Sequence, residues 1–234
     1  MLDLGSTDFY IKVPSMPRDE LEAYSSRIFD LWEARVAQEL TLEDYALTLE
    51  IEEGSIKGSG KIKTGLKALF YVVCGYGSLV QGLQTIRSHV SSAGDYLSEM
   101  AQNVLGPDQP APIVRKKSGT IGQLQRLFVK VQCREMTVDE AISEAKILVE
   151  EEASESSEFM VKLTEALKDT QLHPQQINLP LDGLDEAQAP EEKGKDENPR
   201  TPRPKPAIPP SNQLRVEIWK ESKHGKKKVR VINL

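Results

Sequence analysis

The sequence predicts an α+β fold, in which a small antiparallel sheet packs against amphipathic helices. Residues 45–51 alternate apolar and polar side chains with a period of two, which is typical of a half-buried strand. Apolar residues between Leu21 and Val36 recur at steps of three and four, which places one apolar stripe along a helix. A proline-rich stretch near the C-terminus predicts in addition that part of the chain lies outside the folded body.

The first half of the chain contains the clearest strand pattern. A short strand is predicted at residues 9–13, followed by a helix from Pro17, because proline suits the first helical position. Gly54 and Ser55 predict a turn from the strand at 45–51 into a second strand at 56–62, so that the two form a hairpin.

The central part of the chain is predicted to be helical. A long helical region extends from residue 64 to about residue 104, where Gly106 ends it. Further helices are predicted around residues 121–131, 138–148 and 159–167, and residues 137–140 have the pattern of a capping box. These amphipathic helices are expected to pack on one another or on the first domain.

The last 21 residues return to a strand pattern. Leu214, Val216 and Ile218 alternate with polar or larger side chains, and a turn at residues 223–225 precedes a second alternating run. The tail is therefore predicted to be a β-hairpin. Because two strands alone are marginally stable in water, it is expected to add to the sheet of the body or to a partner.

Composition divides the chain into four predicted parts. Only 38% of the residues are hydrophobic, and the segment poorest in core-forming residues is the proline-rich one, which is predicted to be a disordered linker. The parts are an α+β domain with a Gly-rich apolar helical region (1–111), a helical segment that packs on it (112–171), the linker (172–213) and a basic hairpin (214–234).

Several enzyme chemistries lack the residues that they need. Residues 58–61, Gly-Ser-Gly-Lys, suggest a phosphate-binding loop, but Ser55 stands where that motif requires glycine and Ile62 where it requires Ser or Thr. The favoured interpretation of residues 58–61 is a hairpin strand that contains glycines and is more flexible for that reason. No G-x-S-x-G nucleophile motif occurs. Enzyme activity is therefore unsupported, although not excluded.

No cofactor or metal is predicted, because the three histidines and two cysteines have no zinc-ligand spacing. Cys74 and Cys133 are expected to be reduced, buried thiols, since cysteine is usually buried and no secretory signal is recognised at the start of the chain. Glu50, Glu52 and Glu53 are acidic candidates, but the polar face of a strand is an ordinary place for carboxylates.

The tail concentrates positive charge, with seven basic and two acidic residues in a chain of net charge −6. Such a cluster can contact phosphates or an acidic lipid surface, although the overall charge gives no reason to predict specific nucleic-acid binding. Two other interpretations remain: lysines that discourage edge-to-edge strand pairing, and contacts with the acidic body. The candidate residues are Arg215, Lys220, Lys223, Lys226, Lys227, Lys228 and Arg230.

Residues 68–86 are nineteen residues without a charged side chain, which is near the length that spans a bilayer. Ala68, Gly75 and Gly82 are seven apart, so on one helix they share a face that another helix can approach closely. In a second interpretation, residues 75–77 break the helix. Buried core helices, membrane insertion and a ligand-contacting turn all remain open. The candidate interaction residues are Ala68, Gly75, Tyr76, Gly77, Ser78 and Gly82.

Two short motifs carry a resemblance to a known group of proteins. Glu52-Glu53-Gly54-Ser55 and the later Tyr76-Gly77-Ser78, with Gly82 four residues on, resemble the E-E-G-S and Y-G-S-x-x-x-G signature of an uncharacterised group of small bacterial proteins. The resemblance covers about residues 8–150. It implies a bacterial or phage-associated setting and assigns no activity.

These observations predict a non-catalytic protein-interaction component, in a bacterial or phage multi-protein system, with a protein partner or self-association. A small membrane-acting effector that inserts residues 68–86 is the alternative, and an undetected enzyme is the third. A cytoplasmic location is expected, with membrane association as part of the alternative.

Overall fold

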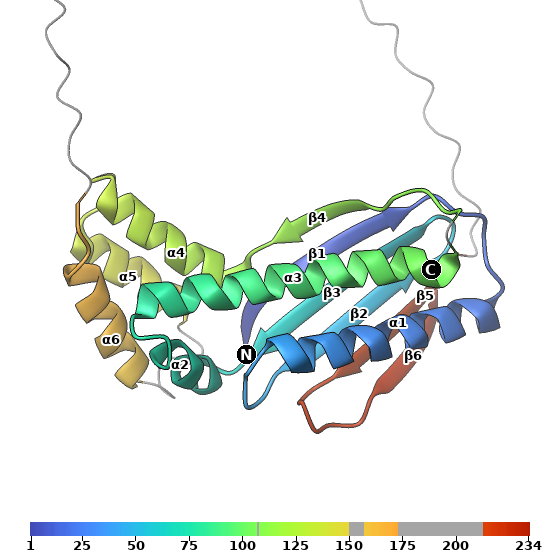
Figure 1. The fold of residues 1–234 in the computed structure, drawn as a ribbon, viewed down its shortest axis with the longest axis horizontal. Coiled ribbons are helices and arrows are strands. Elements are labelled where there is room, and N and C mark those ends of the chain that lie inside the picture. Colours follow the sequence, from blue (N-terminus) through green and yellow to red (C-terminus); the bar gives the residue numbers. More distant parts are fainter. Residues whose placement is uncertain (107, 150–156, 173–212) are drawn as a thin grey trace, which may run out of the picture. The chain divides into compact units, whose positions relative to one another are not determined.

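The computed structural model describes residues 1–106, 108–149, 157–172 and 213–234. These residues form six helices and one six-stranded antiparallel sheet, which confirms the predicted α+β class (Figure 1). The predicted disordered linker lies outside the described residues, apart from its two ends at Leu172 and Gln213.

The sheet joins both ends of the described chain. Its strand order is β4-β1-β3-β2-β5-β6, so the C-terminal hairpin extends the sheet that the N-terminal strands begin. The strands are β1 (Leu2–Ile11), β2 (Ala46–Glu52), β3 (Ile56–Thr64), β4 (Ile113–Lys117), β5 (Leu214–Lys220) and β6 (Lys228–Asn233). Both predicted hairpins are present. However, β1 starts earlier than predicted, and β4 had no counterpart among the predicted elements.

Two helices cover one face of the sheet. These are α1 (Arg18–Glu39) and α3 (Leu79–Leu105), which cross the strands in Figure 1. The alternation in β2 sends Leu47, Leu49 and Ile51 into the core beneath them, and each is fully buried. Trp32 of α1 is also buried. The main core therefore lies between the sheet and these two helices.

Two glycines of β3 allow large side chains to pack directly against the backbone of the strand. A Cβ at Gly58 would come within 2.0 Å of the Phe9 ring, and one at Gly60 within 2.3 Å of a Leu97 methyl group. The glycines are thus explained by close packing of neighbouring side chains. This arrangement supports the hairpin-strand interpretation of residues 58–61.

The other four helices gather at one end of the sheet (Figure 1). They are α2 (Leu66–Cys74), α4 (Gly119–Gln132), α5 (Val138–Leu148) and α6 (Ser157–Lys168). The predicted capping box is present at the start of α5, where Thr137 and Glu140 bond reciprocally. The hydrogen bonds from Thr137 also lower the pKa of the Glu140 carboxyl.

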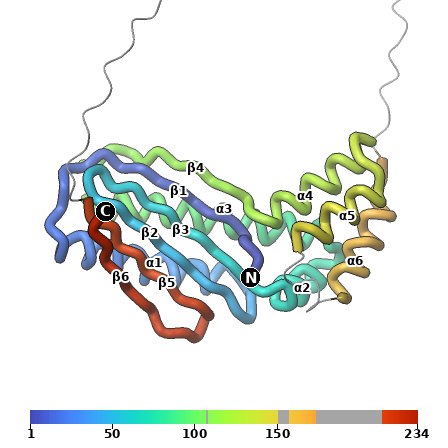
Figure 2. The backbone as a smooth tube through the Cα atoms, turned by 180° about the vertical axis from the view of Figure 1, so that it is seen from behind, coloured from blue at the N-terminus to red at the C-terminus, as the bar shows by residue number. Residues whose placement is uncertain are grey.

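No helix of the described residues lies over the second face of the sheet. Figure 2 shows the molecule from behind, with all six strands in front of α1 and α3. This uncovered side is called the open face below. Antiparallel sheets commonly expose one face to water, and the outward side chains here are largely polar or charged.

Candidate binding surface

The Gly-rich segment forms a bend between two helices. Residues 75–78 separate α2 from α3, and the axes of the two helices differ by 111°. The Ser78 hydroxyl accepts a hydrogen bond from the Gln81 backbone N–H at 3.2 Å and so caps α3. The helical region predicted over residues 64–104 is therefore present as two helices. The interpretation in which residues 75–77 break the helix is confirmed.

The six candidate residues of this segment do not form one surface. Gly82 is buried against α2, where a Cβ would come within 2.6 Å of the Val73 carbonyl oxygen and 2.8 Å of its Cα. Gly75, Gly77 and Ser78 are exposed at the bend, and Tyr76 and Ala68 are half-buried. The shared small-residue face predicted for Ala68, Gly75 and Gly82 does not exist, because these residues belong to two differently directed helices and the bend.

Most of the large apolar side chains of residues 68–86 belong to the core. Leu69, Val73, Leu83 and Ile86 are buried. Within the part of the chain that the structure describes, no single helix is both long and apolar enough to cross a membrane, while α2 and α3 meet that test only as a bent pair. Cys74 and Cys133 are free and exposed, so their predicted burial is wrong.

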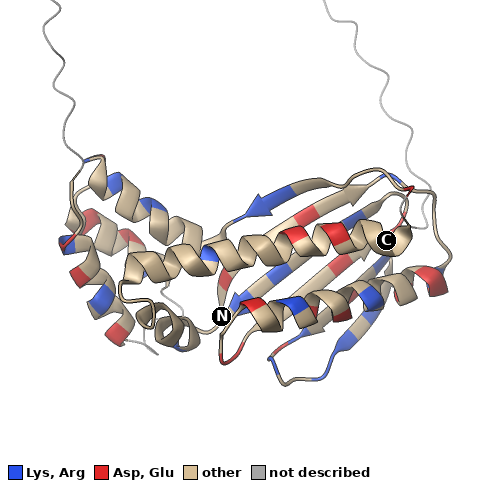
Figure 3. Ribbon diagram, viewed as in Figure 1, with Lys and Arg blue, Asp and Glu red and all other residues tan. Residues whose placement is uncertain are grey.

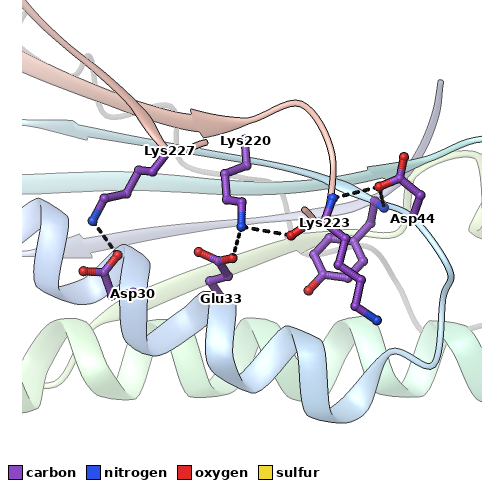
Figure 4. Close-up of polar contacts among 7 residues, drawn as sticks. Asp30, Glu33, Asp44, Lys220, Lys223 and Lys227 are labelled. Carbon is purple, nitrogen blue, oxygen red and sulfur yellow. Dashed lines mark hydrogen bonds and ion pairs between the residues drawn. The ribbon is translucent and has the colours of Figure 1, made fainter. Parts of the chain in front are cut away.

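The hairpin tail is held to α1 and the loop that follows it by its own lysines (Figure 4). Lys220 forms an ion pair with Glu33, and its side chain is only 12% exposed. Lys227 pairs with Asp30, and the Lys223 backbone N–H donates to Asp44 at 2.7 Å. The acidic residues of α1 thus lie opposite the basic tail, as the intramolecular alternative predicts.

The other basic residues of the tail divide into two groups. Arg215 pairs with Glu52 on the neighbouring strand, and Lys228 pairs with Glu221 at 2.7 Å. Lys226 and Arg230 have no ion pair within the described residues. Five of the seven candidate cations therefore have an intramolecular partner, which leaves little of the tail's charge for the anionic partner predicted there.

Lys220→Ala is expected to lower the free energy of unfolding by about 1 to 2 kcal/mol, because it leaves Glu33 without its partner in a poorly exposed site. The matched change Lys226→Ala is expected to alter stability by less than about 0.5 kcal/mol. Urea unfolding of the two variants gives this comparison. Equal effects would contradict the structural role assigned to Lys220.

On the open face, outward side chains form three rows that cross all six strands. The strand registers place them directly opposite one another, in the order β4, β1, β3, β2, β5, β6. The first row is Ile113, Tyr10, Lys57, Glu52, Arg215 and Ile232; the second is Arg115, Asp8, Ser59, Glu50, Glu217 and Arg230; the third, called the lysine row below, is Lys117, Ser6, Lys61, Thr48, Trp219 and Lys228.

The charge of this face differs in sign from that of the whole chain. Its three rows hold seven basic and four acidic residues, a net charge of +3, whereas the chain carries −6. Lys57 and Lys61 of the central strand β3 have no ion pair among the described residues, and neither does Lys63, the next outward residue of that strand. The three lysines follow one another on the outward side of β3, with Glu52 opposite Lys57, Asp3 opposite Lys63, and the charge of Lys61 acting on Asp8.

A groove of about 450 Å³ lies on the first two rows. Tyr10 and Ile113 supply apolar surface, while Lys57, Arg115, Glu50 and Glu52 supply charge of both signs. Ile113 is 66% exposed, which is unusual for a large apolar side chain. The groove could accept a side chain from a bound molecule.

Hydrogen bonds fix the polar centre of the open face. Burial raises the pKa of the Asp8 carboxyl. Hydrogen bonds from Lys117 and Ser59 lower it, as do the positive charges of Lys117 and Lys61. The lowering effects are the larger, so the pKa of Asp8 lies below its ordinary value. The Ser59 hydroxyl donates to Asp8 at 2.7 Å and Lys117 pairs with it at 2.8 Å. Asp8 is therefore ionised at neutral pH and links β4, β1 and β3.

Beside this centre, one guanidinium group interacts with three carboxylates. The hydrogen bond from Arg215 to Glu52 raises the pKa of the arginine, and the charges of Glu52, Glu50 and Glu217 add to this. Glu50 and Glu217 stand directly opposite each other on β2 and β5. Like charges in opposite positions destabilise a sheet, and Arg215, which also pairs with Glu217 at 4.0 Å, offsets part of this repulsion.

Sequence reasoning missed most of this surface. Lys57, Ser59, Lys61 and Lys63 are two residues apart in the sequence, so on a strand they lie on the same side and place three lysines there. However, Arg115 and Lys117 lie on β4, which was not predicted, and the register that aligns six strands cannot be read from local periodicity. Of the three acidic candidates, Glu50 and Glu52 lie on this face, and Glu53 bonds to the Leu214 backbone and to Ser15.

Among the described residues, no group of three or more His, Cys, Asp or Glu side chains could hold a metal ion. No protein-family model, no curated protein and no solved structure matches the chain. The resemblance to the uncharacterised bacterial group therefore stays a prediction.

Proposed function

We propose that this protein is a non-catalytic interaction component that binds a protein partner through the open face of its sheet. The observation that carries the proposal is a sheet face that no described helix covers, with a groove and with lysines that have no ion pair among the described residues, on a sheet whose other face packs against α1 and α3. Tyrosine, tryptophan and arginine, which are enriched in protein interfaces, lie on this face among its charged residues.

The setting that we propose is a cytoplasmic, bacterial or phage-associated multi-protein system, and its support is the motif resemblance alone. The membrane-acting alternative has less support, because the large apolar side chains of residues 68–86 lie mainly in the core. The exposed bend at residues 75–78 is a weaker candidate surface, since it offers few side chains.

Site-specific photo-crosslinking in the native host tests this assignment. Lys57, which is exposed on the open face, is replaced by a photoreactive phenylalanine derivative, and Lys67 on α2 receives the same change as a control. A discrete crosslinked product is expected from position 57 and not from position 67. Tyr71, near the bend, provides a third position. Crosslinking from position 71 without position 57 would move the interaction to the bend.

A further inference from the structure

We infer that the partner presents an acidic, extended segment to the lysine row. This inference rests on the proposed function and adds the chemistry of the partner. The lysine row contains Lys117, Lys61 and Lys228 without a carboxylate, and Lys63 lies next to Lys61 on β3. Charge complementarity is the basis of the assignment.

The cations that we assign to the acidic segment are two half-buried lysines of β3, Lys61 and Lys63. Lys117 and Lys228 already pair with Asp8 and Glu221, whereas Lys61 and Lys63 have no ion pair within the described residues. Outward residues two apart on a strand are about 7 Å apart, which is also the spacing of alternate side chains in an extended peptide. Two carboxylates of such a peptide therefore match Lys61 and Lys63.

Apolar and aromatic surface lies next to these cations. Trp219 stands in the lysine row and is half-buried. The groove beside Tyr10 and Ile113 begins one row away, a distance of about 7 Å along the strands. An acidic segment with a large apolar residue can therefore contact both the lysines and the groove.

The carboxylates of the second row favour a protein over a nucleic acid. Glu50 and Glu217 oppose each other with Arg215 as their nearest shared cation. A phosphate chain carries negative charge at every unit and would be repelled as it left the lysine row. A protein can instead place a basic side chain near Glu50 and Glu217, which would relieve their repulsion.

The direct test measures binding of short probes by fluorescence anisotropy, with the full chain. The probes are an eight-residue glutamate peptide, an eight-residue lysine peptide and a twelve-nucleotide single-stranded thymidine oligomer. The glutamate peptide is expected to bind, more weakly as salt is raised. The double change Lys61→Glu and Lys63→Glu is expected to weaken this binding at least tenfold, whereas Lys226→Glu in the tail is expected to change it less than twofold.

Thermal melting of each variant checks that it is folded. Tighter binding of the thymidine oligomer than of the glutamate peptide would overturn the inference in favour of a nucleic acid. Loss of glutamate-peptide binding in Lys226→Glu alone would overturn it in favour of the tail. Absence of glutamate-peptide binding by the wild-type chain, with crosslinking from position 57 retained, would overturn the acidic partner and leave the proposed function standing.

Discussion

Gly82→Leu is expected to lower the free energy of unfolding by about 3 kcal/mol, because a side chain there would enter the backbone of α2. A Cβ alone would come within 2.8 Å of the Val73 Cα and 2.6 Å of its carbonyl oxygen. Backbone atoms in a packed helix cannot move aside as a flexible side chain can. The two helices would have to separate at the bend to admit leucine.

Gly75→Leu is the matched control. Gly75 is exposed, has a right-handed helical φ of −66° and meets only the Val72 and Tyr71 carbonyl oxygens, at 3.3 and 3.9 Å. Its replacement is therefore expected to change stability by less than about 0.5 kcal/mol. Urea unfolding monitored by circular dichroism measures both variants. A greater loss for Gly75→Leu than for Gly82→Leu would contradict the bent arrangement of α2 and α3.

Ile218→Ala is expected to cost about 2 to 4 kcal/mol, because Ile218 is fully buried beneath the helices. This side chain belongs to β5, which pairs with β2, so the C-terminal hairpin contributes to the main core. Ile232→Ala on the adjacent β6 is expected to cost less than about 1 kcal/mol, since Ile232 is only half-buried on the open face.

Thermal unfolding of the two isoleucine variants separates an integral hairpin from an appended one. An integral hairpin predicts a single transition that moves to lower temperature in Ile218→Ala. A hairpin that docked only weakly would give equal, small effects of the two changes, or a separate early transition for the tail. Either of these results would contradict the six-stranded sheet.

The strands and helices with strong local periodicity were predictable from sequence. The alternation of residues 45–51 became β2, and the stripe between Leu21 and Val36 became the buried side of α1. By contrast, β4 is short and reads Ile-Val-Arg-Lys-Lys, so it offers no apolar alternation to detect. The helix break was one of two readings because the same glycines permit a continuous helix.

The candidate surface was harder to predict, since it depends on contacts between distant segments. Lys220 and Glu33 are 187 residues apart, and no local pattern indicates that the tail lysines meet the acidic residues of α1. The sequence therefore left three interpretations of the basic tail open: edge-strand lysines, an anionic partner and contacts with the acidic body. The lysines of β3 looked ordinary, although the strand register places them on an uncovered face beside Lys117 of β4.

Lysine acylation rates on the isolated chain, measured residue by residue by mass spectrometry, test most directly whether the available cations lie on the open face. Lys61 and Lys63 are expected to react faster than Lys220 and Lys223, because the first two have no ion pair and the last two are held by Glu33 and by the Leu42 carbonyl. Equal rates for all four, or faster reaction of Lys220 and Lys223, would contradict the account.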